Sequence, residues 1–511
     1  MTSATLSPAS AGADASPQAF SDFLATFKAK LHHAFHVRAD VDEFSTKRGL
    51  PPFVLREILS ANPLSAFIPS EHGGRGGKAS ESIAVLSAAS YESLALSLTF
   101  GINWALFIQP VAKYGQAALK ESVFSRFINE QNMGGLMLTE PDYGSDLLSM
   151  QTSYTETDEH YHVSGVKHWG GLTGWADYWL VAARQDTGER GLKRDIDFFV
   201  ADMNASGQHI EVEEVYENLG LYMIPYGRNK LDLHIPKLNK LEPHSTGVRM
   251  MLDLLHRSRM QFPGMAMGFL QRLLDEGIEH CKTRLVGSGS LFDLDQVQRR
   301  LATLQANFTI CSAMCAYSAE NIDMNNDYSL RNIEANTIKA VVTDMMQASS
   351  QSLLQLVGGQ GYRLNHIAGR ATVDSRPFQI FEGSNDLLYT QISEAILKLM
   401  RKEKIGNLLE FLKAYAMTEK VTQRFGDALN FEVDLKLPQR KLVDLGRALG
   451  RLMSMQFVLE LGHKGFRSDL IDASLSSLQQ DIMGLLSTFK TNFSADVVDD
   501  YQENASWLEL V

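Results

Sequence analysis

Residues 138–146 read Leu-Thr-Glu-Pro-Asp-Tyr-Gly-Ser-Asp, and the pattern of the sequence changes at this stretch. Before it, from Phe20 to about Asn132, apolar residues recur every three or four positions, a period that predicts amphipathic helices. After it, as far as about His244, short apolar runs such as Tyr178–Val181 are bounded by Gly, Asp, Asn and Pro, which predicts strands. The stretch therefore opens a compact β domain that follows a helical one.

Helical periodicity returns after Pro243. Four long helices with Gly-rich breaks between them are predicted, over about 246–285, 293–325, 331–357 and 384–402. Beyond Lys404, apolar residues between Ile471 and Phe489 repeat at four-three spacing on one helix face, so the last hundred residues are also expected to be helical and packed.

The resulting fold class is mostly α with a central β domain, an α+β arrangement. Five segments are expected: a disordered tail over 1–19, an N-terminal helical domain over 20–133, a β-barrel or β-sandwich domain over 134–244, a C-terminal four-helix bundle over 245–403, and a helical extension over 404–511.

Charge and cysteine content restrict the class of protein. A net charge of -12 over 511 residues argues against a nucleic-acid binder, because neutralising phosphates needs a basic face. Three cysteines, an odd and sparse set, favour a reducing cytoplasm over a secreted, disulfide-bonded protein. Cys311 and Cys315 lie one helical turn apart, but no second pair or matching His cluster accompanies them, so no metal site is predicted.

No targeting or membrane-spanning segment is predicted. The first 19 residues are rich in Ala, Ser and Pro and contain no Lys or Arg, unlike a signal peptide or a mitochondrial presequence. The most apolar stretch, Leu96–Ile108, is interrupted by polar residues and Gly and is too short to span a bilayer. We expect a buried helix there and a cytoplasmic protein.

Glycine clusters do not form a nucleotide-binding loop. Residues 72–79, His-Gly-Gly-Arg-Gly-Gly-Lys-Ala, lack the spacing and the final Ser or Thr of a P-loop. Residues 358–361, Gly-Gly-Gln-Gly, follow a helical pattern and not a strand, which argues against a Rossmann unit. No HExxH, GxSxG or paired CxxC motif occurs, so hydrolysis and zinc chemistry are not predicted.

Three separated segments together carry a more specific pattern. Residues 138–146 open the β domain, residues 165–169 (Gly-Val-Lys-His-Trp) follow, and residues 381–386 (Phe-Glu-Gly-Ser-Asn-Asp) precede the last bundle helix. Their order and spacing resemble the acyl-CoA dehydrogenase family, whose typical runs are Leu-Thr-Glu-Pro-x-x-Gly-Ser-Asp, Gly-x-Lys-x-Trp-Ile-Thr and Tyr-Glu-Gly-Thr. The resemblance extends over about residues 20–402 and leaves the C-terminal hundred residues outside it.

The resemblance implies FAD as cofactor and an acyl thioester, carried by CoA or by an acyl-carrier protein, as substrate. The implied FAD contacts in the β domain are Leu138, Thr139, Gly144, Ser145, Trp169 and Gly171. Those in the helical part are Arg284, Gln296, Gln355, Gly359, Ser384 and Asp386, of which the first two would reach FAD across a dimer interface. The implied substrate contacts are Ser145, Arg259 and Gly383. The implied partners are an electron-transfer flavoprotein and further copies of the chain, in a homodimer or a dimer of dimers.

Glu382 is the implied base of an α,β-desaturation, in which a carboxylate takes the α-proton while hydride leaves the β-carbon for flavin N5. An α-proton is much less acidic than a carboxyl group, so such a base needs a dry site that raises its pKa. A lone Glu-Gly pair is usually a solvated turn. Thr139, as a hydroxyl for the flavin edge, and Trp169, as a flat apolar surface, give Glu382 its context, whereas Glu140 is read as structural.

The sequence departs from the family pattern at several places, among them Val373-Asp374 where the family has Arg-Asp and Leu136 where it has Tyr, and two further differences concern the flavin and the base. After Trp169 the family has Ile-Thr, with the Thr hydroxyl reaching flavin N5, but this chain has Gly at 170 and 171. A backbone N–H, a water or Thr173 is left to take that place. Some relatives carry the base on the bundle helix, where this chain has Ser258, so no carboxylate there competes with Glu382.

Two other functions stay open. An oxidase or monooxygenase on the same scaffold is favoured by the altered surroundings of N5 and disfavoured by Glu382. A non-catalytic flavoprotein or assembly factor would bind a partner through the helical extension. The leucine face Leu442, Leu445, Leu449 and Leu452 could complete a subunit interface, cover the bundle or touch a membrane surface, and covering the bundle is the expectation.

Overall fold

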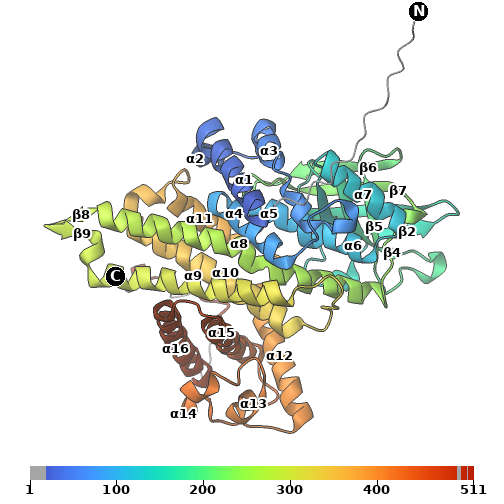
Figure 1. Ribbon diagram of the computed structural model, residues 1–511. Coiled ribbons are helices and arrows are strands. Elements are labelled where there is room, and N and C mark those ends of the chain that lie inside the picture. Colours follow the sequence, from blue (N-terminus) through green and yellow to red (C-terminus); the bar gives the residue numbers. More distant parts are fainter. Residues whose placement is uncertain (1–18, 492–496, 503–504) are drawn as a thin grey trace, which may run out of the picture.

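The computed structural model describes residues 19–491, 497–502 and 505–511 of the chain (Figure 1). The disordered tail expected over residues 1–19 lies outside the described residues except for its last position. The N-terminal helices lie against the long helices of the bundle, the strands gather at one end of these helices, and the C-terminal helices lie along the side of the bundle (Figure 1).

The N-terminal part is helical, in agreement with the three-to-four period of its apolar residues. Its α-helices are α1 (Phe20–His33), α2 (Val41–Phe44), α3 (Pro52–Leu59), α4 (Ala79–Glu92), α5 (Leu94–Gly101), α6 (Gln109–Tyr114) and α7 (Ala117–Asn129). Two π-helical segments, η1 (Ala34–Arg38) and η4 (Ile102–Ile108), continue α1 and α5 without a break. Phe27, Leu31 and Leu86 are fully or almost fully buried between these helices, which accounts for the apolar period.

The expected buried helix is confirmed. Among the described residues, one helical stretch, Leu94–Tyr114, has the length and apolar composition needed to cross a membrane. Of its most apolar window, 94% is buried inside the protein, as is common for a core helix.

The central strands form one curled seven-stranded sheet. They are β1 (Gly134–Met137), β2 (Ser153–Glu156), β3 (His160–Gly171), β4 (Tyr178–Gln185), β5 (Asp197–Asp202), β6 (Gln208–Val215) and β7 (Tyr226–Pro236). The order is β1-β4-β2-β3-β7-β6, and β5 pairs with β4. The long hairpin-like pair β3 and β7 is antiparallel from His160 opposite Pro236 to Gly171 opposite Tyr226. A bulge between His168 and Gly170 interrupts it, and a bulge re-aims the side chain it carries.

The bundle helices confirm the four predicted segments. They are α8 (Gly247–Thr283), α9 (Asp295–Asn321), α10 (Asn332–Val357) and α12 (Asn385–Glu403), with the shorter α11 (Ile367–Ser375) between α10 and α12. A two-stranded hairpin of β8 (Leu285–Val286) and β9 (Gly289–Ser290) joins α8 to α9 and projects at the end of the bundle opposite the sheet (Figure 1). The mostly α fold with a central β domain is therefore confirmed.

The C-terminal extension is helical and packs on the bundle. Its helices are α13 (Leu408–Ala414), α14 (Gly426–Leu429), α15 (Gln439–His463) and α16 (Ser468–Lys490), and a short 3₁₀ turn, η12, covers Trp507–Leu510. Leu445, Leu449 and Leu452 are almost completely buried, and α15 packs against α9, α10 and α12. In this structure the leucine face of α15 covers the bundle.

A close backbone contact fixes α15 on α12, and it predicts the effect of adding one methyl group. A Cβ built on Gly446 would lie 2.1 Å from the carbonyl oxygen of Tyr389, a backbone atom that cannot rotate away. We expect Gly446→Ala to push the helices apart and to lower the free energy of unfolding by about 1–3 kcal/mol. Thermal and urea unfolding of the full chain measure this.

Gly484 of α16 is the matched control, because a Cβ there meets nothing within 4 Å. Gly484→Ala should stabilise the chain by roughly 0.5–1 kcal/mol through helix propensity alone. Equal melting temperatures for the two variants would contradict the close packing of α15 on α12.

Candidate active site

Glu382 lies in a tight turn between the 3₁₀ segment η10 (Arg376–Gln379) and α12. Its backbone is left-handed, with φ of 53°, and Gly383 follows with φ of 92°. A non-glycine residue in this region is strained and persists only where its surroundings hold it. Two buried cations hold it here: Arg259 Nε donates to the Glu382 carbonyl at 3.0 Å, and Lys339 Nζ donates to the Gly383 carbonyl at 2.8 Å.

The two oxygens of the Glu382 carboxylate are in different situations. Oε1 accepts a hydrogen bond of 2.8 Å from Ser258 Oγ, whereas Oε2 is buried and has no partner among the described residues. Burial raises the pKa of Glu382, and the Ser258 hydrogen bond and the charges of Arg259 and Lys339 partly oppose that rise. A buried oxygen without a partner is costly, and Oε2 is the carboxylate oxygen on which no hydrogen bond from the described residues blocks the acceptance of a proton.

A polar network extends from this turn to the C-terminal extension. Lys339 Nζ also donates to Asn385 Oδ1 at 3.0 Å, and Asn385 Nδ2 donates to Asp344 Oδ1 at 2.7 Å. Asp344 in turn lies 3.7 Å from the guanidinium of Arg451 on α15. Burial lowers the pKa of Lys339 to about 7, with the Arg259 charge also lowering it and the Glu382 charge opposing. Lys339 is a site residue that the motifs did not predict, although a lysine inside the apolar run of α10 is a signal of a buried charge.

An aromatic wall covers the other side of the turn. The rings of Phe262 and Phe378 lie 5.9 Å apart, those of Phe262 and Phe381 lie 6.0 Å apart, and those of Phe378 and Phe381 lie 4.9 Å apart. Phe381 directly precedes Glu382, so the three rings place large apolar surfaces next to the turn.

Trp169 lies in the bulge of β3 and presents its ring at the surface. Its φ is 56°, and half of the residue is exposed. The Tyr216 ring lies 4.6 Å from it and the Tyr226 ring 6.2 Å from it. A half-exposed indole braced by two tyrosines is a flat surface against which a planar ring can lie.

Gly171, next to this bulge, has no space for a side chain. A Cβ there would lie 2.8 Å from Ile102 Cδ1 and 3.4 Å from the Tyr226 ring. Ile102 and Tyr226 thus fill the volume that the family's threonine side chain would take. Thr173 is not free to replace that threonine, because its hydroxyl donates to the Gly170 carbonyl at 2.7 Å and accepts from Asn229 at 3.0 Å.

A continuous series of contacts joins the Trp169 bulge to Glu382. Ile102 directly follows Gly101, whose carbonyl accepts from Gln261 Nε2 at 3.1 Å, and the same amide donates to Ser258 Oγ at 3.2 Å. The series runs through Gly171, Ile102, Gly101, Gln261, Ser258 and Glu382. Helix α5 and the π-helical segment η4 therefore connect the sheet beside the bulge to the helix α8 that holds the Glu382 carboxylate.

The loop of residues 138–146 is fastened beside this bulge by a buried ion pair. Glu140 accepts from Lys167 Nζ at 2.8 Å and from the backbone N–H groups of residues 151 and 152 at 2.6 and 2.9 Å. Lys167 also donates to the Leu138 carbonyl at 3.0 Å, and burial lowers its pKa to about 8. The Thr139 carbonyl accepts from the N–H of residue 168 at 3.0 Å. Glu140 is thus structural, and it sets Thr139 next to Trp169.

The remaining predicted contacts of the loop and of α12 are exposed. Gly144 and Ser145 lie on the outer part of the loop. Ser384 caps α12 by accepting from the Leu387 N–H at 3.4 Å. Asp386 forms a 3.0 Å ion pair with Arg447 of α15.

Four predicted FAD contacts lie elsewhere, at the hairpin end of the bundle. They are Arg284, Gln296, Gln355 and Gly359, and all four are exposed. Arg284 is 25 residues beyond Arg259 on the axis of α8, which is about 38 Å at 1.5 Å per residue. Leu356, next to Gln355, packs with Cys281 and Val297 in a small core that joins these ends. Within one chain, this group does not meet Glu382.

Three family models match: "Acyl-CoA dehydrogenase, N-terminal domain" over residues 27–131, "middle domain" over 135–232 and "C-terminal domain" over 245–397. Together they cover more than half of the sequence. The chain belongs to the acyl-CoA dehydrogenase family, and the resemblance predicted from its motifs is confirmed.

Curated relatives are distant in sequence. The very long-chain specific acyl-CoA dehydrogenase of Mus musculus is 24% identical over 354 residues, which is 67% of this chain and 53% of that protein. The acyl-CoA dehydrogenase of Bacillus subtilis (strain 168) is 23% identical over 372 residues, 71% of this chain and 93% of that protein. The chain spans about half the length of the first of these.

Solved structures share the fold. An acyl-CoA dehydrogenase complexed with FAD from Bacillus anthracis superimposes with a TM-score of 0.74 at 18% identity, covering 93% of this chain and 88% of that one. Butyryl-CoA dehydrogenase from Megasphaera elsdenii gives 0.65 at 21% identity, covering 74% and 98%. Because the first covers nearly the whole chain, the C-terminal extension also has a structural counterpart.

The low pKa of Lys339 predicts a pH dependence of stability. The unfolded chain keeps the lysine proton up to a pKa near 10.4, whereas the folded chain releases it at about 7. Between these values the unfolded state holds about one proton more, so this group makes the free energy of unfolding rise by roughly 1.4 kcal/mol per pH unit. Lys339→Met should remove that contribution, as measured by urea unfolding between pH 7.5 and 9.5.

Lys402 on α12 is exposed and serves as control, because Lys402→Met should retain the wild-type slope. A Lys339→Met chain with an unchanged slope would show that Lys339 is not the group that loses its proton.

Proposed function

We propose that the protein is an FAD-dependent acyl thioester dehydrogenase in which Glu382 is the catalytic base. The observation that carries this proposal is the buried Oε2 of Glu382, which has no hydrogen-bond partner among the described residues, while Ser258 holds Oε1. Membership of the family supports FAD, and so does the FAD complex of the similar Bacillus anthracis structure. The half-exposed indole of Trp169 provides a flat surface that suits a flavin ring.

Bound FAD supplies a hydride acceptor for the β-carbon of the acyl chain. Glu382 Oε2 takes the proton from the α-carbon while Ser258 keeps Oε1 in place. Burial of the carboxyl raises its pKa, which makes the carboxylate a stronger base for the transfer. Arg259 and Lys339 hold the carbonyls of the turn, which fixes the direction in which the carboxylate points.

We propose a class of substrate, an acyl thioester, and two candidate carriers for the acyl group, CoA and an acyl-carrier protein. The Bacillus subtilis relative is named an acyl-CoA dehydrogenase, and a structure with a TM-score of 0.65 is titled a prolyl acyl carrier protein oxidase. CoA thioesters are the first choice because they dominate among the relatives, and carrier-bound thioesters are the second. An electron-transfer flavoprotein is the proposed acceptor. The three cysteines are all unpaired, which supports the proposed reducing, cytoplasmic location.

The proposed base can be tested directly. Glu382→Gln should slow anaerobic flavin bleaching by acyl-CoA about 10²–10⁴-fold, because an amide cannot take the proton.

A second variant tests the hydrogen bond on Oε1. Ser258→Ala removes a hydrogen bond that lowers the Glu382 pKa. The rate needs ionised Glu382 and rises with pH through that pKa, so this variant should shift the rise to higher pH. Stopped-flow absorbance over a pH series measures both effects.

Glu394 is an exposed carboxylate on the same helix, α12, and Glu394→Gln should bleach at the wild-type rate. Normal bleaching by Glu382→Gln would refute the base. If the flavin is fully bound but no CoA or carrier-protein thioester bleaches it, the dehydrogenase proposal fails.

The split between the two groups of predicted FAD contacts supports a dimer. A cofactor that touches both the Trp169 bulge and the Arg284 end of the bundle cannot do so within one chain, given the length of α8 between them. A symmetric pair of chains can place the Arg284 end of each chain at the site of the other. We therefore expect each active site to contain residues of two chains.

Mixing two inactive variants tests this shared site. Arg284→Glu should impair FAD retention and Glu382→Gln should abolish proton removal. In a co-expressed mixture, half of the dimers contain one site with both native residues, so roughly a quarter of the wild-type activity should return. Absence of any recovery, with heterodimers shown by mass spectrometry, would place Arg284 and Glu382 in separate functions.

An oxidase is the second candidate, and the observation that favours it is the apolar contact of Ile102 and Tyr226 at Gly171. A flavin without the threonine hydroxyl of the family pattern has a different hydrogen-bonding environment at N5. Turnover in air without an added acceptor distinguishes the two: hydrogen peroxide formed in proportion to product supports the oxidase, and its absence supports the dehydrogenase.

A further inference from the structure

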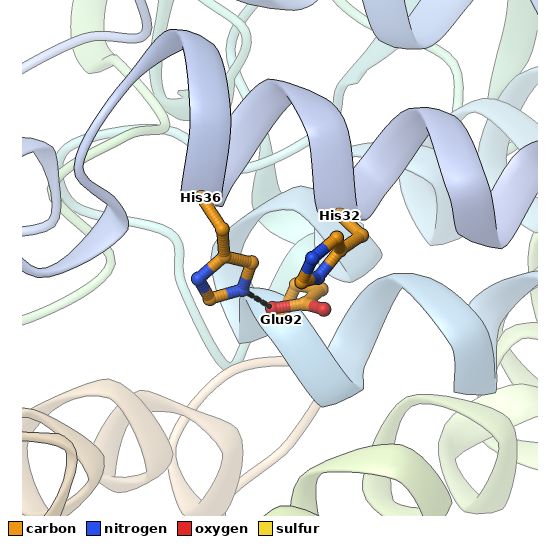
Figure 2. A group of neighbouring side chains, drawn as sticks. All are labelled: His32, His36 and Glu92. Carbon is orange, nitrogen blue, oxygen red and sulfur yellow. Dashed lines mark hydrogen bonds and ion pairs between the residues drawn. The ribbon is translucent and has the colours of Figure 1, made fainter.

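His32, His36 and Glu92 form a compact cluster that the proposed reaction does not use (Figure 2). The first two come from α1 and the π-helical segment η1 that continues it, and Glu92 is the last residue of α4. Both imidazole rings point toward the carboxylate in Figure 2. One potential ligand atom from each residue lies within 4.8 Å of those of the other two, and His36 Nε2 lies 2.7 Å from Glu92 Oε2.

The local helix geometry aligns the two histidines. In an α-helix a residue four positions on overshoots a full turn, because a turn contains 3.6 residues. The change to the wider π-helix at Ala34 reduces this overshoot. The two rings consequently stack, with centroids 4.7 Å apart.

Glu92 is a carboxylate in a place that favours a cation. It ends α4, where the carbonyl end of the helix dipole disfavours negative charge. Its side chain is only 10% exposed, and its ion pair among the described residues is with His36, which is charged only when protonated. A bound cation would compensate both the carboxylate and the helix end.

The intervening His33 has a different role. Its Nδ1 contacts Glu57 of α3, which also lies 3.9 Å from Arg38, so its side chain is directed away from the cluster. In HExxH zinc sites the position after the first histidine carries the catalytic glutamate. Here that position is His33, so the cluster has the means to bind a metal ion and lacks that general base.

From this geometry we infer that His32, His36 and Glu92 form a binding site for a divalent transition-metal ion of the zinc type. Two histidines and one glutamate are a ligand set that zinc takes in proteins, with water as the fourth ligand. For all three side chains to bind one ion, they must rotate slightly, and the proton shared by His36 Nε2 and Glu92 Oε2 must leave. The ion would link the end of α1 to the end of α4, and so join the first described helix to the rest of the N-terminal domain.

A second cluster, His162, Asp232 and His234, lies on the sheet and is the natural competitor. His162 Nε2 lies 2.8 Å from Asp232, and the His162 and His234 rings stack at 4.6 Å. The Asp232 side chain is 67% exposed, compared with 10% for Glu92. Water already solvates such a carboxylate, so it gains less from a metal ion, and we assign the stronger site to Glu92.

The test uses the full flavin-loaded chain, freed of metal with a chelator. Zn²⁺ binding is followed by competition with a chromophoric chelator, and Co²⁺ binding by its visible absorption bands. We expect one site per chain, with affinity at least tenfold weaker in His36→Ala and Glu92→Gln. Because metal binding displaces protons, affinity should also fall as the pH is lowered from 7.5 to 6. Zn²⁺ should raise the melting temperature of the wild type and not that of these variants.

Two controls are matched to the site. His33→Ala, in the same turn of helix, and the double variant His162→Ala/His234→Ala should bind Zn²⁺ with wild-type affinity. Binding lost in the double variant and kept in Glu92→Gln would move the site to the sheet, and no saturable binding by the folded wild type would overturn the proposal. If Glu92→Gln fails to fold, His32→Ala takes its place in the test, because it removes only an exposed ring. It should also weaken Zn²⁺ binding at least tenfold. Flavin content and Glu382-dependent bleaching are read in parallel and should not change.

Discussion

The left-handed turn at Glu382 and Gly383 is the constraint on which the candidate site depends. Neither Arg259 nor Lys339 pairs its cation with the carboxylate by a direct hydrogen bond. Both donate to backbone carbonyls of the turn instead. The carboxylate therefore keeps one free oxygen while the backbone beneath it is held by two buried charges. Direct salt bridges would lower the pKa of Glu382 and occupy the oxygen that has to receive a proton.

In the β domain, too, a buried basic side chain holds a backbone carbonyl. Glu140 and Lys167 are both buried, and their pair anchors the loop that presents Thr139 next to Trp169. Buried ion pairs contribute little net stability, but breaking one partner leaves an uncompensated charge. Positional accuracy is the benefit, because a loop fixed at Glu140 cannot slide along β3. The π-helical segment η4 then supplies Ile102, which closes the gap between sheet and bundle.

Periodicity in the sequence predicted the long helices and the change from helical to β and back to helical segments, because amphipathic patterns are local and the core face of each element lies on one side. The motif around Glu382 indicated the proposed base, since its residue types are contiguous in the sequence. Lys339, Tyr226 and Ile102 were missed because their roles arise from contacts between segments far apart in the chain. The packing of Ile102 and Tyr226 at Gly171 could not be predicted for the same reason. The sequence shows that the threonine side chain is missing, but not which side chains fill its place. The cluster of His32, His36 and Glu92 was not predicted, because Glu92 follows His32 by sixty residues in the sequence.

The polar network that joins Arg451 to Asp344, Asn385 and Lys339 gives the C-terminal extension a share in the energetics of the site. Arg447 adds to this by holding Asp386, a residue that the family pattern assigns to the cofactor. A ligand that engages Asp386 has to displace or accommodate Arg447. By linkage, the free energy with which the extension docks and the free energy with which that ligand binds then depend on each other equally in both directions. Residues of the extension, which lie outside the matched family domains, would in this way change the affinity of a ligand of Asp386 without touching that ligand.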